Sequence, residues 1–242
     1  MIPLLILAQI LVDHGCTDPK KIPLSHLDKA RSLRILFGHQ SVGGNLLSGL
    51  EELASADEKR YSMERSSDPG SDWKGLGEFE VGENENPRGK IDHFARKLSK
   101  DGFGKRTDVA MMKLCYVDFG ESEEDAPALF RRYRDTMETL ERDFGKVRLV
   151  WWTAPLADSG NRARHAYNQL IREHCSAKKR ILFDIADLEC HDPKDRRHVE
   201  DGVPRLYSGY TDDGGHLNEI ARRRVAGSFW WLLARIAGWD GK

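Results

Sequence analysis

Short, continuously apolar segments alternate along the chain with segments whose apolar residues recur at helical spacing. The apolar segments have the length of strands and cover residues 34–38, 108–115, 147–153 and 181–185. Helical spacing is found around residues 46–53, 91–98, 129–144, 161–174 and 217–236. Strands that are apolar throughout are buried on both faces, which is typical of a parallel sheet between two layers of helices. The pattern predicts a three-layer α/β/α sandwich.

Two stretches do not fit this alternation. Residues 62–86 are rich in glycine, serine, aspartate and asparagine, and we expect them to be mainly loop. Residues 1–30 are expected to form an N-terminal leader or tail, so that the folded domain spans residues 31–242. The apolar run of residues 2–12 is too short to cross a bilayer, and no lysine or arginine precedes it as in an export signal. A cytoplasmic and an exported protein both remain open.

Composition narrows the classes of partner. The 242 residues include 38 Lys and Arg against 39 Asp and Glu, a formal net charge of −1 that gives no long-range attraction for nucleic acid. Local basic clusters lie on or beside expected helices, close to acidic residues, and are interpreted as solvated helix faces. The four cysteines show no CxxC spacing, and their pairing is left open. Cys190, His191 and His198 lack the paired spacing of metal ligands, so we expect no metal.

Ser41 lies where the first apolar strand turns into a helix, in the segment Phe37–Asn45. In open parallel sheets ligands bind beyond the carboxyl ends of the strands, so side chains in such turns are candidates for chemistry. A serine hydroxyl there can act as a nucleophile, and the amides of the helix N-terminus favour a developing oxyanion. A serine that merely caps the helix is equally common at this place. This segment alone leaves both interpretations open.

A second chemical segment, Thr211–Leu217, immediately precedes the last expected helix. Asp213 stands three residues before His216, and two glycines bridge them. Such a carboxylate can bind the imidazole Nδ1, which fixes the tautomer and stabilises the imidazolium that forms when Nε2 takes a proton. A glycine-rich helix entry capped by Asp213 is the structural alternative. The coincidence of acid, histidine and glycines favours the functional interpretation.

Across about residues 31–240 the chain resembles the SGNH (GDSL-like) hydrolases. Residues 213–217 match the DxxH motif that precedes the last helix in such families, and residues 37–41 resemble their serine block. The serine block departs from the pattern, because His39 and Gln40 stand where the family usually has a single aspartate. The resemblance implies a flavodoxin-like SGNH hydrolase fold.

Two further blocks concern the oxyanion. Gly82–Asn84 resembles the block whose glycine amide helps to form the oxyanion hole, and Leu114–Asp118 occupies the place of the GxND block. Asp118 matches that block, but Val117 stands where the oxyanion asparagine is expected. Loss of one such donor typically costs about 3 kcal/mol in the transition state. Candidates for a replacement donor or a substrate contact are Asn84, Asn45, Gln40 and His39.

Some residues in these blocks also have a purely structural interpretation. His39 could equally be a hydrogen-bonded histidine beneath the loop. We expect Asp118 to tie neighbouring loops together through backbone amides, and Tyr116, at the end of a strand, is a candidate for lining the pocket.

The resemblance implies an ester hydrolase that works through an acyl-enzyme without a cofactor. Ser41 would attack the acyl carbonyl, His216 would take its proton, Asp213 would orient the imidazole, and the amides of Ser41 and Gly82 would hold the oxyanion. A small acyl group on a carbohydrate is the substrate that the resemblance suggests. An O-acyltransferase would use the same residues with an alcohol in place of water. A catalytically weak carbohydrate-binding domain is the second alternative, and Val117 motivates it.

Overall fold

A parallel sheet forms the centre of the computed structural model, which describes residues 9–70, 73–120 and 122–242. Seven parallel strands are described. Their order across the sheet is β1 (Leu11–Val12), β7 (Ile181–Phe183), β6 (Arg148–Trp152), β5 (Val109–Met112), β2 (Arg34–His39), β4 (Gly75–Glu80) and β3 (Arg65–Ser66). A separate antiparallel pair consists of β8 (Val199–Glu200) and β9 (Val203–Pro204). Each of the four predicted strands is present, although β5, β6 and β7 are shorter than predicted.

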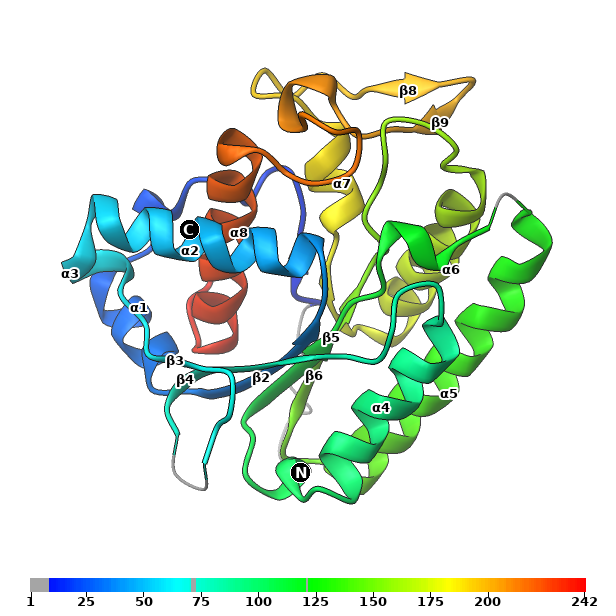
Figure 1. Ribbon diagram of the computed structural model, residues 1–242. Helices are drawn as coiled ribbons and strands as arrows, with labels where there is room; N and C mark the ends of the chain where they lie inside the picture. Colours follow the sequence, from blue (N-terminus) through cyan, green and yellow to red (C-terminus); the bar gives the residue numbers. More distant parts are fainter. Residues whose placement is uncertain (1–8, 71–72, 121) are drawn as a thin grey trace, which may run out of the picture.

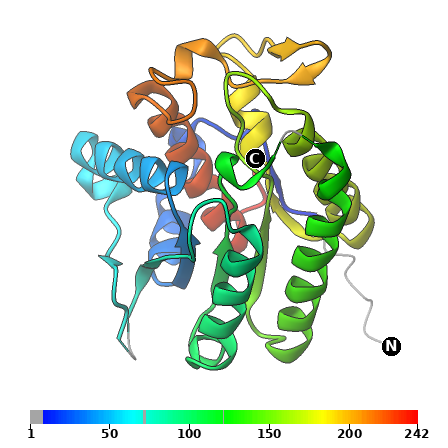
Figure 2. The same cartoon turned by 45° about the vertical axis from the view of Figure 1, so that its right-hand side comes forward.

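Helices cover both faces of the sheet (Figure 1, Figure 2). One layer consists of α1 (Leu24–Arg31), α2 (Val42–Ala56), α3 (Glu58–Tyr61), α7 (Ile185–Cys190) and α8 (Glu219–Ile236). The other consists of α4 (Pro87–Ser99), α5 (Ala126–Asp143) and α6 (Arg162–Lys178). Short 3₁₀ turns lie at Pro19–Lys21, Phe103–Lys105, Tyr116–Asp118, Glu123–Asp125 and Ser208–Tyr210. Trp151 and Trp152 belong to opposite cores, as expected of neighbours on a strand. The prediction of a three-layer sandwich is confirmed.

The order of the strands creates a switch point between β2 and β5. From β2 the chain passes to β4 on one side and then crosses back to β5 on the other side of β2. The core order β4-β2-β5-β6-β7 is the flavodoxin-like order, and ligands in such folds bind outside the carboxyl ends of the strands at the switch point. The loop that carries Ser41 follows β2, and the turn that carries Tyr116 follows β5.

Strand β4 was missed by the sequence analysis, which expected residues 62–86 to be mainly loop. Its sequence, GLGEFE, has no continuous apolar run, because two glycines stand at positions where neighbouring atoms come close. Gly75 has φ of +73°, and a Cβ there would lie 2.3 Å from Glu64 O. A Cβ at Gly77 would lie 2.9 Å from the Pro69 side chain. Close packing therefore removed the hydrophobic signal that identifies a buried strand.

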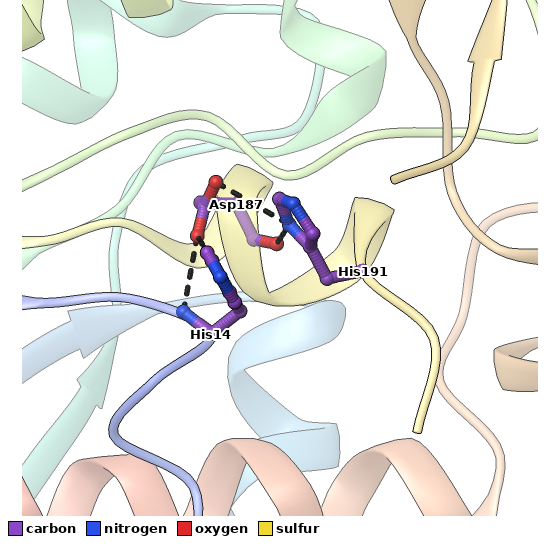
Figure 3. Close-up of side chains that lie close together, drawn as sticks. All are labelled: His14, Asp187 and His191. Carbon is purple, nitrogen blue, oxygen red and sulfur yellow. Dashed lines mark hydrogen bonds and ion pairs between the residues drawn. The ribbon is translucent and has the colours of Figure 1, made fainter. Parts of the chain in front are cut away.

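Residues 9–30 pack against the sheet. Strand β1 pairs with β7, and the backbone N–H of His14 donates to Asp187 Oδ2 at 3.0 Å. The His14 imidazole Nδ1 lies 2.5 Å from the same oxygen, and its ring stacks on His191 with centroids 3.8 Å apart (Figure 3). Much of the apolar run of residues 2–12 lies outside the described residues, and the domain limit at residue 31 stays a prediction.

Two further properties of the described residues concern membrane-spanning helices and the pairing of the cysteines. No helix among them is sufficiently long and apolar to cross a membrane. All four cysteines, Cys16, Cys115, Cys175 and Cys190, are free thiols.

A test of the helix packing is the substitution Gly49→Ala. In an isolated helix alanine is favoured over glycine by about 1 kcal/mol. Here a Cβ at Gly49 in α2 would lie 2.2 Å from Arg222 O in α8, so the two helices would have to separate. We expect the free energy of unfolding to fall by about 1–3 kcal/mol, as measured by urea denaturation.

The matched control is Gly44→Ala in the same helix, where no heavy atom lies within 4 Å of the added Cβ. This variant should keep the wild-type stability or gain up to about 1 kcal/mol. Equal behaviour of the two variants would contradict the close approach of α2 and α8.

Glu189 of α7 is a second point that stability measurements can test. Its carboxyl group is buried, and Oε2 accepts the Leu156 N–H at 2.6 Å. Burial raises the pKa of Glu189 from 4.5 to about 8, although the amide of Leu156 and the charges of Lys113 and Arg164 oppose this rise. The folded protein therefore keeps a proton that the unfolded chain releases above about pH 4.5.

The stability of the wild type should consequently contain a component that falls as the pH rises from about 4.5 to about 8. Glu189→Gln keeps an oxygen that can accept the Leu156 N–H but cannot titrate. Urea midpoints measured across this interval should vary less with pH in Glu189→Gln than in the wild type. Glu124→Gln, at an exposed position, is the control and should follow the wild type. Parallel pH profiles of wild type and Glu189→Gln would contradict the raised pKa.

Candidate active site

Ser41 immediately precedes α2, two residues after the end of β2, with φ 54° and ψ −112°. Positive φ is uncommon for a residue other than glycine and is characteristic of strained turns at functional sites. The serine side chain makes no capping hydrogen bond to the helix. Its Oγ lies 2.8 Å from His216 Nε2, although the two residues are 175 positions apart in the sequence. The hydroxyl is thus directed to the imidazole and not to the backbone of α2.

The segment before α8 brings Asp213 and His216 together. Asp213 Oδ2 lies 2.7 Å from His216 Nδ1, while Oδ1 accepts the backbone N–H groups of Gly215 and His216 at 3.0 and 2.7 Å. These two amides, and then the imidazole, hold the pKa of Asp213 well below its usual range. The ionised carboxylate favours a proton on Nδ1, which leaves the Nε2 lone pair free to accept the Ser41 proton.

Asn45 positions this segment from α2. Its Oδ1 accepts the backbone N–H of Leu217 at 3.0 Å, immediately after the histidine. On the other side the N–H of Asp158 donates to Gly214 O at 2.8 Å. The segment that carries His216 is therefore held by α2 and by the loop after β6. Asn45, a candidate oxyanion donor from the sequence, thus links α2 to the segment that precedes α8.

His39 and Gln40, the other two candidates beside Ser41, are bonded to β4 and the loop after it. The buried imidazole of His39 has Nε2 2.6 Å from Glu78 Oε2. Burial lowers the pKa of His39, although the hydrogen bond and charge of Glu78 oppose that effect. Gln40 Nε2 donates to Val81 O at 3.3 Å and also to Gly82 O. Both side chains fasten the Ser41 loop to its neighbour, which is the structural alternative considered for His39.

Gly82 and Asn84 are also engaged with other groups. The Gly82 N–H donates to His93 Nδ1 at 2.9 Å, so this amide is not free for an oxyanion. Asn84 Oδ1 accepts from the buried Lys90 ammonium at 2.9 Å. Lys90 also donates to both carboxylate oxygens of Asp118, at 2.8 and 2.7 Å. Asp118 ties the loops together as expected, because it accepts the backbone N–H groups of Glu85 and Cys115.

Tyr116 completes the surroundings of the imidazole from the turn after β5. Its ring meets His216 edge-on, with centroids 5.8 Å apart and planes at 79°. Its backbone carbonyl accepts a hydrogen bond from Arg164 Nη1 at 2.8 Å. From the sequence, Tyr116 was a candidate for lining the pocket because it lies at the end of a strand.

One group of side chains in the described residues has the composition of a metal site. His14, Asp187 and His191 each offer a ligand atom, and these atoms lie within 4.8 Å of one another (Figure 3). The two rings are stacked with planes only 17° apart, so their lone pairs run side by side instead of converging on one ion. His191 Nδ1 also lies 2.8 Å from the backbone carbonyl oxygen of Asp187. The arrangement suits a hydrogen-bonded latch between β1 and α7, and the absence of a metal stays a prediction.

Neither a protein-family model nor a curated protein sequence matches this chain. Solved structures are similar to it in fold. An acetyl xylan esterase is 18% identical with a TM-score of 0.53, over 81% of this chain and 98% of its own. A GDSL-like lipase from Bacteroides thetaiotaomicron is 10% identical with a TM-score of 0.55, over 86% and 90%. A carbohydrate esterase of family 3 from Talaromyces cellulolyticus is 12% identical with a TM-score of 0.54, over 85% and 98%. The expected resemblance is thereby confirmed for the architecture: the chain has the fold of the SGNH (GDSL-like) hydrolases.

Proposed function

We propose that this protein is a serine esterase that acts through an acyl-enzyme. The observation that carries the proposal is the continuous chain of hydrogen bonds from Ser41 Oγ to His216 Nε2 and from His216 Nδ1 to Asp213. Nucleophile, base and orienting carboxylate in this order are what acyl transfer by a serine requires. The site also lies at the carboxyl edge of a parallel sheet, where this fold binds its ligands.

In the proposed reaction Ser41 Oγ attacks the carbonyl carbon of the ester while His216 Nε2 takes the hydroxyl proton. Asp213 stabilises the imidazolium across Nδ1. The tetrahedral intermediate then breaks its bond to the alcohol oxygen, and His216 returns the proton to that oxygen. Water, activated by the same imidazole, releases the acyl group from Ser41 and restores the free serine.

The substrate that we propose is a small acyl group, such as acetyl, attached to a carbohydrate. The side chains of His216 and Asp213 are 45% and 56% exposed, so the reacting atoms lie at the surface. An open site suits an ester group that projects from a bulky polar molecule. Two proteins of the same fold are described as an acetyl xylan esterase and a carbohydrate esterase, which supports this choice.

Two alternatives use the same surface. An O-acyltransferase would pass the acyl group from Ser41 to an alcohol instead of water, so added acceptor alcohols would raise the yield of a new ester over free acid. A carbohydrate-binding domain without turnover is favoured by Val117, which stands where an oxyanion asparagine is expected. Only this second alternative predicts that Ser41 is unreactive.

Ser41→Ala and His216→Ala should each lower kcat/KM for p-nitrophenyl acetate by about a thousandfold or more. The serine and histidine act as a unit, so loss of either removes most of the catalysis. Asp213→Asn should cause a comparable or smaller loss, because it misorients the imidazole without removing it. Unfolding midpoints should change little, since the side chains of His216 and Asp213 are about half exposed.

The matched control is Ser48→Ala, which should keep wild-type activity. Ser48 lies in the same helix, α2, about two turns beyond Ser41. A fluorophosphonate probe followed by intact mass and peptide mapping should label Ser41. Equal background rates for wild type and Ser41→Ala over a panel of short acyl esters, without labelling of Ser41, would favour the binding domain.

A further inference from the structure

The developing oxyanion needs donors that are free. Among the described residues, the Ser41 amide N–H has no hydrogen-bond acceptor, so it is available at the nucleophile. One donor is half of what acyl-transfer sites usually provide, and removal of a single donor typically lowers kcat by 10²–10³. Val117 has an apolar side chain and cannot supply the second donor.

Three of the candidates from the sequence, His39, Gln40 and Gly82, are already bonded to other groups. The Gly82 amide donates to His93, the Gln40 amide donates to backbone carbonyls, and His39 Nε2 is bonded to Glu78. Asn45 and Asn84 are held by their carbonyl oxygens, through Leu217 N–H and the Lys90 ammonium. Their Nδ2 groups are the donors that compete with Tyr116 for this role.

The phenol end of Tyr116 lies against the segment that carries His216. A Cβ built on Gly215 would lie 2.6 Å from Tyr116 Oη and 2.5 Å from Cζ, so the phenol end of the ring is pressed against the residue that precedes His216. The backbone of Tyr116 is anchored by Arg164, whose guanidinium also donates to the carbonyl oxygens of Ser159 and Gly160. The Tyr116 ring therefore holds a hydroxyl donor beside Gly215 and His216.

This phenol remains a donor at neutral pH. Burial first, and then the negative charge of Asp213, raise the pKa of Tyr116, while the Ser41 side chain opposes the rise. The influence of the Ser41 side chain on this pKa agrees with the position of the phenol beside His216, whose Nε2 lies 2.8 Å from Ser41 Oγ.

We propose that the Tyr116 hydroxyl, together with the Ser41 amide, forms the oxyanion hole and replaces the asparagine missing at position 117. The inference rests on the proposed esterase function. When the Oγ–C bond forms, the Ser41 proton moves to His216 Nε2 and the carbonyl π pair moves onto oxygen. The Tyr116 O–H donates to this oxyanion, which is a stronger acceptor than the neutral Oγ. When the C–O bond to the alcohol breaks, the pair returns to the carbonyl and the phenol keeps its own proton throughout.

The test is Tyr116→Phe, which keeps the ring against Gly215 and His216 and removes only the donor. For p-nitrophenyl acetate we expect kcat to fall about a hundredfold or more with KM within about twofold, because the lost contact exists only in the transition state. An alkylboronic acid, which forms a tetrahedral adduct with the serine, should lose affinity by a similar factor. The acidic limb of the pH profile of kcat/KM, which follows protonation of the base, should stay in place.

Tyr61→Phe is the matched control. Tyr61 Oη accepts a hydrogen bond from Arg60 Nε in the core beneath α2, so this variant loses a phenol hydroxyl away from the site and should keep wild-type kinetics.

Three results would overturn the inference, and they are distinguishable. Wild-type kcat in Tyr116→Phe, with Ser41→Ala inactive, leaves the esterase intact and removes the tyrosine from the oxyanion hole. If Tyr116→Phe shifts the acidic limb of the kcat/KM profile and leaves the affinity for the boronic acid unchanged, Tyr116 positions His216 and does not bind the oxyanion. Absence of both Ser41-dependent turnover and Ser41 labelling in the wild type rejects the esterase and this inference with it.

Discussion

Two backbone amides and one imidazole converge on the Asp213 carboxylate, and the geometry of the site depends on this convergence. Oδ1 is held by the peptide N–H groups of Gly215 and His216, so the carboxylate is oriented with Oδ2 toward His216 Nδ1. That orientation determines the tautomer of His216 and hence which ring atom is presented to Ser41. The lowered pKa of Asp213 keeps the arrangement ionised at ordinary pH.

The distance between serine and histidine is in turn a consequence of helix packing. Ser41 immediately precedes α2, and His216 lies three residues before α8, so the approach of these two helices determines how far apart the side chains lie. Gly49 permits close approach of the backbones, Glu52 Oε1 binds the Arg222 guanidinium at 2.8 Å, and Asn45 holds Leu217. The contact between Ser41 and His216 is therefore supported by the core on the same side of the sheet.

Local patterns predicted much of this structure, but not the parts that rest on long-range partners. Apolar runs identified β2, β5, β6 and β7, because strands buried on both faces need continuous hydrophobicity. The same rule missed β4, where glycines replace the apolar residues. The spacing of Asp213 and His216 was readable because their contact is local. The roles of Asn45, Gln40 and His39 were not, since each is decided by a partner that the fold brings from another segment.

The pairing of β1 with β7 has a consequence for synthesis of the chain. His14 and Asp187 are 173 residues apart, so the early strand leaves the ribosome long before the edge that receives it exists. Until then the backbone N–H and C=O groups of β1 are hydrogen-bonded to water. Once β7 forms, its outer edge is unpaired until β1 docks. Docking of β1, fastened by the stacked imidazoles of His14 and His191, is expected to be a late step that closes an aggregation-prone edge.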